Sequence, residues 1–236
     1  MEKQYRNVLV LSSTQSTLQI TGVTMVAITG LAGYSLADNK AFATVPLTCY
    51  VLGSAITTIP ASFLMRSVGR RAGFQTGTAI GMAGGLICSL AIYLANFWLL
   101  CAGMLVMGMY TAFGKYYRFA AADAASDSFR AKAISFTLAG GILGGIIGPE
   151  MAKRTKDMFA DHVFLGSYLS LSCVCLLAML ILSQLDIPKL SAKERKDPGR
   201  PLGEIMRQPV FVVAVLASML SYGIIDRKST RLNSSH

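Results

Sequence analysis

Six long runs of apolar residues constrain most strongly what this chain can fold into. Each is long enough, or nearly so, for the roughly 20-residue helix that crosses the hydrocarbon core of a bilayer. The runs are Val8–Leu36, Phe42–Met65, Gly73–Ala95, Phe97–Gly114, Ala133–Ala152 and Val163–Leu185. Only 14% of the 236 residues are charged, whereas soluble domains have about 25%. The chain is therefore predicted to be an all-α, polytopic membrane protein.

The basic residues predict how these helices are oriented. If the N-terminus is cytoplasmic, the inner segments hold fifteen Lys and Arg residues and the outer segments hold four. Cytoplasmic loops carry such an excess, so we expect a multi-pass protein of the cell (inner or plasma) membrane with its N-terminus inside. The net charge of +10 then reflects loops beside anionic lipid rather than nucleic-acid binding.

Cysteine and histidine residues give no pattern typical of a metal or redox site. The five cysteines all fall in apolar runs, form no CxxC motif, and are predicted to be buried, unreactive thiols: Cys49, Cys88, Cys101, Cys173 and Cys175. The only histidines are His162 and His236. We therefore expect neither a metal nor a cofactor.

The order of the segments predicts four regions. Residues 1–185 form a six-helix bundle, and the charged residues 186–208, rich in Pro and Gly, form a cytoplasmic linker. Residues 209–225 begin a seventh transmembrane helix. The last eleven residues, DRKSTRLNSSH at 226–236, interrupt it with charges that each cost about 2.5–3.5 kcal/mol at a bilayer centre. This string resembles a translated sequencing-library adapter, so we expect an artefactual tail on a truncated gene.

Two short stretches between the runs carry charges beside a turn. The loop SFLMRSVGRRAG contains Gly69, Arg70 and Arg71. Glycine permits a tight reversal between two helices, and the arginines can pair with acidic groups at the inner interface. After the fourth run, Asp123 precedes a short polar turn that ends at Arg130.

The fifth run is unusually rich in glycine. Gly140, Gly144 and Gly148 recur at every fourth position, as do Gly141 and Gly145, and Pro149 follows the last of them. Together they predict a groove, one or two residues wide, that lets another helix approach closely. Pro149 loosens the helix near its outer end. We interpret the groove as helix packing at a moving interface, and static packing without a mechanistic role is the alternative.

These three stretches, with six spans, a central basic loop and a further span, resemble the major facilitator superfamily. The first is similar to its signature loop, although Arg66 stands where the family has Asp. The second resembles its connection between spans four and five. The Gly144–Gly148–Pro149 core resembles the antiporter motif of drug exporters, without the flanking glycines. The resemblance implies the N-terminal six-helix half of a transporter whose two halves rock around a midplane site.

Polar groups inside a membrane span are candidates for substrate contact. In the first run, Gln15 and Gln19 share a helix face with Gly22. In the fourth, Thr111, Lys115 and Arg118 share a face. The resemblance implies that these two helices line the central cavity.

The depth of the two basic residues allows two interpretations. Counted from Phe97 at 1.5 Å per residue, Lys115 lies about 27 Å and Arg118 about 32 Å into the span, near the inner boundary of a ~30 Å core. Their side chains either snorkel to the interface or form a basic cluster at the cavity floor, which would favour an anionic or zwitterionic substrate. Glu150 and Asp38 are near the outer interface, so either a proton-coupling carboxylate lies in the missing half or the coupling differs altogether.

The resemblance implies a transporter that works by alternating access, and not an enzyme. Our first prediction is proton-coupled efflux of a small organic molecule, as in an antiporter, because of the glycine–proline core. The alternative is proton- or ion-coupled uptake of a metabolite, including an anionic one. In that case Lys115 and Arg118 matter more. A membrane-embedded sensor or enzyme would need His, Asp, Glu or Ser groups clustered at one depth. The expected partners are the lipid bilayer, the substrate, protons and the missing C-terminal half.

The predicted topology can be tested with single cysteines. A membrane-impermeant maleimide added to intact cells should label Asn39→Cys and Asp161→Cys, because both positions are predicted to face outward. It should not label Ser67→Cys or Ser191→Cys, which are predicted to face the cytoplasm. The reverse labelling pattern would contradict the topology.

Overall fold

The computed structural model describes residues 2–187 and the isolated positions 208, 213, 216 and 217. The chain divides into two compact units, Met1–Leu190 and Ser191–His236, and all the elements below belong to the first. Most of the predicted linker, the start of the seventh helix and the artefactual tail lie outside the described residues. Those three assignments stay predictions.

The described bundle is helical throughout. Its elements are α1 (Glu2–Leu36), the 3-10 helix η1 (Lys40–Phe42), α2 (Val45–Val68), α3 (Arg70–Tyr93), α4 (Phe97–Gly114), α5 (Tyr117–Asp123), α6 (Arg130–Thr155) and α7 (Leu165–Leu182). Within the described residues, six segments are long and apolar enough to cross a membrane, and α4 with α5 forms the fourth, Phe97–Asp123. The predicted all-α class is confirmed.

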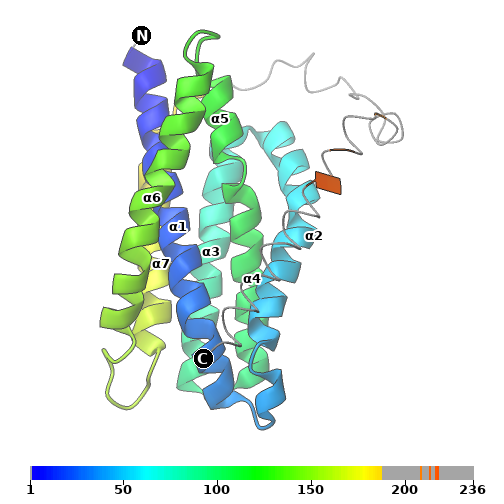
Figure 1. Cartoon of the computed structure of the whole chain (residues 1–236), viewed down its shortest axis with the longest axis vertical. Coiled ribbons are helices and arrows are strands. Elements are labelled where there is room, and N and C mark those ends of the chain that lie inside the picture. The colour runs from blue at the N-terminus through cyan, green and yellow to red at the C-terminus, as the bar shows by residue number, and fades with distance from the viewer. Residues whose placement is uncertain (1, 188–207, 209–212, 214–215, 218–236) are drawn as a thin grey trace. The chain divides into compact units, whose positions relative to one another are not determined.

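Most of the packed helix pairs are not consecutive in the sequence. α1 packs on α6, α2 packs on α4, and α3 packs on both α4 and α7. In the view of Figure 1, α6, α1, α4 and α2 lie across the near side, and α3 and α7 lie behind them. The N-terminus, the α2–α3 turn and the α5–α6 loop gather at one end of the bundle, which we call the inner end.

Buried polar residues of α1 satisfy their own hydrogen bonds. The Thr14 and Thr21 hydroxyls donate to the carbonyl four residues earlier, at 2.7 and 2.9 Å. The Thr17 hydroxyl donates to the Thr14 carbonyl at 2.7 Å. A buried hydroxyl without a partner would be costly, so these bonds explain how a Thr-rich helix lies in the core. The largest fully buried side chains of the bundle include Tyr110, Tyr117, Tyr168, Phe74 and Met25.

Gly69 makes the reversal between α2 and α3, as the sequence predicted. Its φ of 95° lies in a region that L side chains rarely adopt. Its N–H donates to the Met65 carbonyl at 3.0 Å and its own carbonyl accepts from Gly73 at 3.0 Å. One glycine therefore ends one helix and begins the next.

The glycines of α6 hold α1 at backbone distance. A Cβ on Gly140 would lie 2.9 Å from the Ser12 carbonyl carbon, and one on Gly148 would lie 2.9 Å from the Val23 Cβ. A Cβ on Gly144 would lie 2.8 Å from the Gln19 Cβ. Real Cβ atoms essentially never come this close to other atoms, so only glycine permits this approach of the two helices.

Hydroxyl groups of α1 reinforce the same contact. Those of Ser12, Ser16 and Thr24 donate to the carbonyls of Phe136, Gly140 and Gly148 at 2.8, 2.5 and 2.9 Å respectively. Interhelical hydrogen bonds of this kind contribute roughly 0.6 kcal/mol each in a membrane protein. Much of the polar character of α1 therefore serves its packing on α6.

The groove on α6 is one residue wide, which is the smaller of the two widths that the sequence predicted. A Cβ on Gly145 would meet nothing within 4 Å, and one on Gly141 would be in ordinary contact with Gln15, at 3.6 Å. These two glycines do not hold α1. Pro149 is exposed, and α6 continues through it to Thr155.

The prediction of five buried cysteines is wrong for Cys173, which is exposed, and Cys49 is only half-buried. Cys88, Cys101 and Cys175 are buried. Cys173 lies two residues from Cys175 on α7, so the two side chains point to different sides of the helix. An apolar run does not reveal which of its faces is turned outward.

A single added methyl group tests the α1–α6 contact. Gly144→Ala in the full-length protein should lower the free energy of unfolding by roughly 1–3 kcal/mol, because overpacking forces the two helices apart. Gly145→Ala and Ile142→Leu are matched controls on the same helix and should change stability little. Thermal unfolding of the purified proteins measures this, and equal stability of the two alanine variants would contradict the account.

Candidate functional site

Two residues of the predicted signature stretches meet at the inner end. Arg70 is the first residue of α3 and Asp123 is the last residue of α5, and their side chains form an ion pair. Arg130 pairs instead with its neighbour Asp127 at 3.1 Å, and Arg71 is exposed. The pair ties the α2–α3 turn to the end of the fourth span.

A second inner-end contact had no signal in the sequence. The Asn7 side chain, 4% exposed, donates to the Asp186 carbonyl at 2.8 Å and accepts from the Asp186 N–H at 3.0 Å. The Asp186 carboxylate lies 3.4 Å from Lys3 Nζ and 3.5 Å from an Arg6 guanidinium nitrogen. The chain just beyond α7 is thereby fastened to the first turns of α1.

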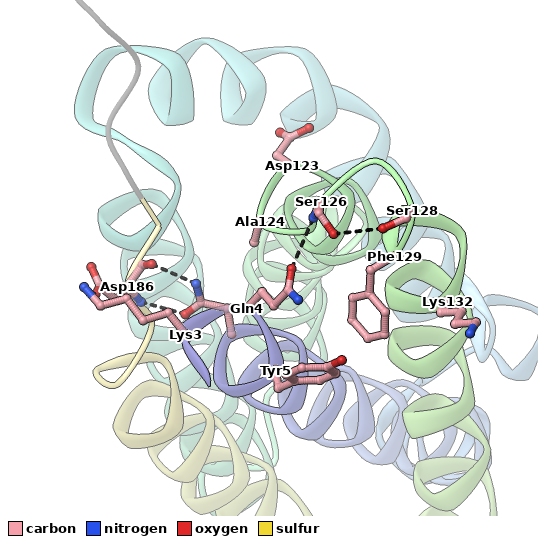
Figure 2. A pocket seen from close by; sticks show the side chains of 11 residues that line it. Lys3, Gln4, Tyr5, Asp123, Ala124, Ser126, Ser128, Phe129, Lys132 and Asp186 are labelled. Carbon is pink, nitrogen blue, oxygen red and sulfur yellow. Dashed lines mark hydrogen bonds and ion pairs between the residues drawn. The ribbon is translucent and has the colours of Figure 1, made fainter. Parts of the chain in front are cut away.

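A cavity of about 800 Å³ opens beside this contact. In Figure 2, Lys3 lies beside Asp186, and Phe129 and Lys132 lie on the other side of Gln4. The Gln4 side chain accepts from the Ser126 N–H at 3.3 Å, and the Tyr5 and Phe129 rings meet edge to face at 4.9 Å. Its two carboxyl groups, those of Asp123 and Asp186, are both already paired with cations.

Two polar residues of α1, Gln15 and Gln19, lie near the middle of the bundle. α6 covers one side of α1, and Leu18 packs against Gly114 of α4 on another, where a Cβ on that glycine would lie 3.0 Å from the Leu18 Cγ. Between these contacts Gln15 is half-buried and Gln19 is exposed. The two glutamines therefore lie at the edge of the α1–α6 contact, next to Gly141 and Gly144.

Lys115 stands at a break in the fourth span. α4 ends at Gly114 and α5 begins at Tyr117, so the span continues to Asp123 and is longer than the sequence predicted. The Lys115 Nζ donates to the Ser54 hydroxyl at 2.9 Å. Ser54 lies fourteen residues from either end of the second span, Lys40–Val68. The amine therefore reaches the level of the middle of α2 and does not extend toward the inner end.

Two further hydrogen bonds join α2 to the fourth span on either side of Lys115. The Tyr50 and Thr111 hydroxyls are 2.9 Å apart, and the Tyr116 hydroxyl donates to the Thr58 carbonyl at 2.8 Å. A Cβ on Gly22 of α1 would lie 3.9 Å from the Tyr50 hydroxyl, which brings α1 next to this pair. We call Gln15, Gln19, Tyr50, Thr111 and Lys115 the mid-span face.

Sequence reasoning missed Tyr50, Ser54 and Thr58. They recur at every fourth position, which is the spacing of one helix face, so the signal was present. They stayed hidden because hydroxyl groups are common in packed transmembrane helices.

Arg118 is not part of the mid-span face. It is exposed on α5, and its guanidinium carbon lies 4.9 Å from the centre of the Phe119 ring. The predicted basic cluster of Lys115 and Arg118 is therefore reduced to one lysine.

The two acidic residues considered for proton coupling are near the outer end. Asp38 is exposed just beyond α1. Glu150 is exposed on α6, and its carboxylate accepts from Arg154 Nε at 2.6 Å. Neither is near the mid-span face.

Comparison with known proteins identifies the family to which this fold belongs. The model of the Major Facilitator Superfamily matches residues 9–226. The chain belongs to the major facilitator superfamily, and its six-helix bundle corresponds to the N-terminal half of such a transporter.

The chain is also similar to two curated relatives and to one solved structure. The riboflavin transporter RfnT of Brucella anthropi is 38% identical over 226 residues, which covers 93% of this chain and 56% of RfnT. The uncharacterized transporter YdeG of Bacillus subtilis is 30% identical over 132 residues, covering 56% of this chain and 31% of YdeG. The E. coli fucose–proton symporter FucP has a similar fold, with a TM-score of 0.65 and 14% identity over 92% of this chain and 56% of FucP. The chain thus spans about half the length of RfnT.

Proposed function

We propose that the full-length protein transports riboflavin or a closely related flavin across the cell membrane by alternating access. The observation that carries this proposal is the mid-span face, a set of amide, hydroxyl and amine groups left open at the level of Ser54. Its presence in a chain 38% identical to a riboflavin transporter points to a flavin as the substrate. Polar groups inside a membrane bundle mark substrate pathways.

The chemistry of the face suits a flavin. The flavin ring is flat and carries an imide with two carbonyl acceptors and one N–H donor, and its side chain carries several hydroxyl groups. The amides of Gln15 and Gln19 both donate and accept hydrogen bonds, and the Lys115 amine only donates. The ring of Tyr50 adds an aromatic surface against which a flat ring can pack.

We propose uptake, coupled to protons, as the direction of transport. The efflux prediction rested on the Gly144–Gly148–Pro149 core, but the two glycines pack α6 on α1 within one half, which transport in either direction requires. The amine of Lys115 beside Ser54 favours the alternative in which an intramembrane cation serves uptake. Because Asp38 and Glu150 are near the outer end, the coupling carboxylate is expected in the second half. The cytoplasmic position of the N-terminus is part of this proposal.

Flavin uptake tests the proposal directly. Cells that cannot make riboflavin and that express the full-length transporter should accumulate labelled riboflavin, more so when the outside is acidic. Gln15→Ala and Gln19→Ala should each lower kcat/KM about tenfold, because the loss of one well-placed hydrogen bond costs about 1.4 kcal/mol. Gln184→Ala, an exposed glutamine beyond α7, is the matched control.

Two outcomes would contradict the proposal. If labelled riboflavin neither enters nor leaves cells faster than in the empty-vector control, the substrate is wrong. If preloaded cells lose riboflavin faster while uptake is unchanged, the direction is wrong and the efflux prediction holds.

A further inference from the structure

We propose that the Lys115 amine is the mid-span binding site for an anionic group, a carboxylate or a phosphate. The group is carried either by the transported molecule or by the second half of the transporter. The first of these sources rests on the proposed function, since it requires that the mid-span face bind the substrate. The second does not depend on which molecule is transported.

Lys115 carries a positive charge at the level of the middle of a span. An ammonium group at the centre of a bilayer costs about 2.5–3.5 kcal/mol on insertion scales, and such residues pair with other groups or line a water-filled pathway. The Ser54 hydroxyl accepts one hydrogen bond from it, at 2.9 Å. An ammonium has three N–H donors, and a neutral hydroxyl does not balance a full charge.

No carboxylate in the described part of the chain is placed to neutralise it. Glu2 is the first residue of α1, and the other acidic residues there all lie near the ends of helices or in loops: Asp38, Asp123, Asp127, Glu150, Asp157, Asp161 and Asp186. The nearest along the fourth span is Asp123, which is eight residues on, or about 12 Å of helix, and is paired with Arg70.

The other described cations differ from Lys115 in their position. Those in ion pairs lie near the two ends of the bundle, where water also solvates them: Lys3, Arg6, Arg70, Arg130, Arg154 and Lys156. Arg118 is exposed on α5 beside Phe119. Lys115 alone among the described basic residues has its charged group held at the level of the middle of a span.

The geometry leaves the amine open to an incoming group. Lys115 is exposed in this half, and it lies at the break between α4 and α5, where the chain turns for two residues. Ser54 is 5% exposed, so it holds the amine on the side that faces α2. The other two N–H groups of the amine stay accessible. The partial negative charge at the end of α4 supports the cation but amounts to about half a charge. The balancing anion therefore comes from outside the described bundle.

The test uses the full-length transporter with Lys115→Gln, which removes the charge and keeps an N–H donor, and with Lys115→Arg, which keeps the charge. Arg118→Gln is the matched control, because it removes a charge three residues away. Two properties are measured on the purified proteins: the Tm without substrate, and the tightness with which riboflavin and riboflavin 5′-phosphate bind.

The two sources give different results. If a carboxylate of the second half is the partner, Lys115→Gln should lower the Tm by several degrees, and changing one second-half Asp or Glu to its amide should restore it. If the transported molecule carries the anion, the Tm should stay unchanged. Riboflavin 5′-phosphate should then bind at least tenfold more weakly to Lys115→Gln, with a smaller change for uncharged riboflavin. In both cases Lys115→Arg should behave more like the unaltered protein than Lys115→Gln does.

The proposal is overturned if Lys115→Gln matches Arg118→Gln in both properties. It is also overturned if the Tm falls, no second-half amide restores it, and anion binding is unchanged. If Lys115→Gln does not reach the membrane, the same second-half amide changes are combined with it, and the amount of protein in the membrane is measured in place of the Tm. If the unaltered protein binds neither flavin, the proposed flavin substrate fails, and the amide scan alone decides whether Lys115 has an anionic partner.

Discussion

The backbone contact between α1 and α6 determines what the rest of this bundle can present. Helices in lipid gain nothing from burying apolar surface against each other, so close packing and hydrogen bonds hold them together. Gly140, Gly144 and Gly148 allow the two backbones to touch, and hydroxyl groups of α1 bond to carbonyls of α6. Gln15 and Gln19 lie at the edge of that contact, where Gln15 is half-buried and Gln19 is exposed. A packing constraint on one pair of helices thus selects the polar groups that a substrate could meet.

The pairing of α2 with the fourth span supplies the other side of the mid-span face. Three hydrogen bonds hold the break between α4 and α5 against α2: Tyr50 bonds with Thr111, Ser54 accepts from Lys115, and the Thr58 carbonyl accepts from Tyr116. A break in a transmembrane helix is tolerated where neighbours or a polar cavity satisfy its backbone groups. It also lets Lys115 direct its amine across the bundle rather than along the helix. The position of the only mid-span cation described in this half follows from that arrangement.

Sequence patterns predicted the parts of the fold that depend on local chemistry. The length and apolarity of the runs predicted six spans, and Gly69 predicted the α2–α3 turn, because a positive φ is a local property. The position of Lys115 was harder to predict. Depth was counted as if the fourth span ended at Gly114, whereas the span continues through a break to Asp123.

Contacts between distant residues could not be predicted in this way. The hydrogen bonds between Asn7 and Asp186 join residues 179 positions apart, and nothing in either neighbourhood indicates the partner. The exposure of Cys173 is another case, since it depends on which face of α7 packs against the bundle. Composition predicts that a helix is in the membrane, and only packing decides where each face points.

We propose that the transported molecule binds at the mid-span face. An electron cryo-microscopy structure of the full-length transporter with bound riboflavin tests it most directly. We expect density for the ligand at the level of Ser54, within hydrogen-bonding distance of Gln15 or Gln19 and beside Thr111. Ligand density only in the inner-end cavity between Lys3 and Lys132, with the mid-span face empty, would contradict it.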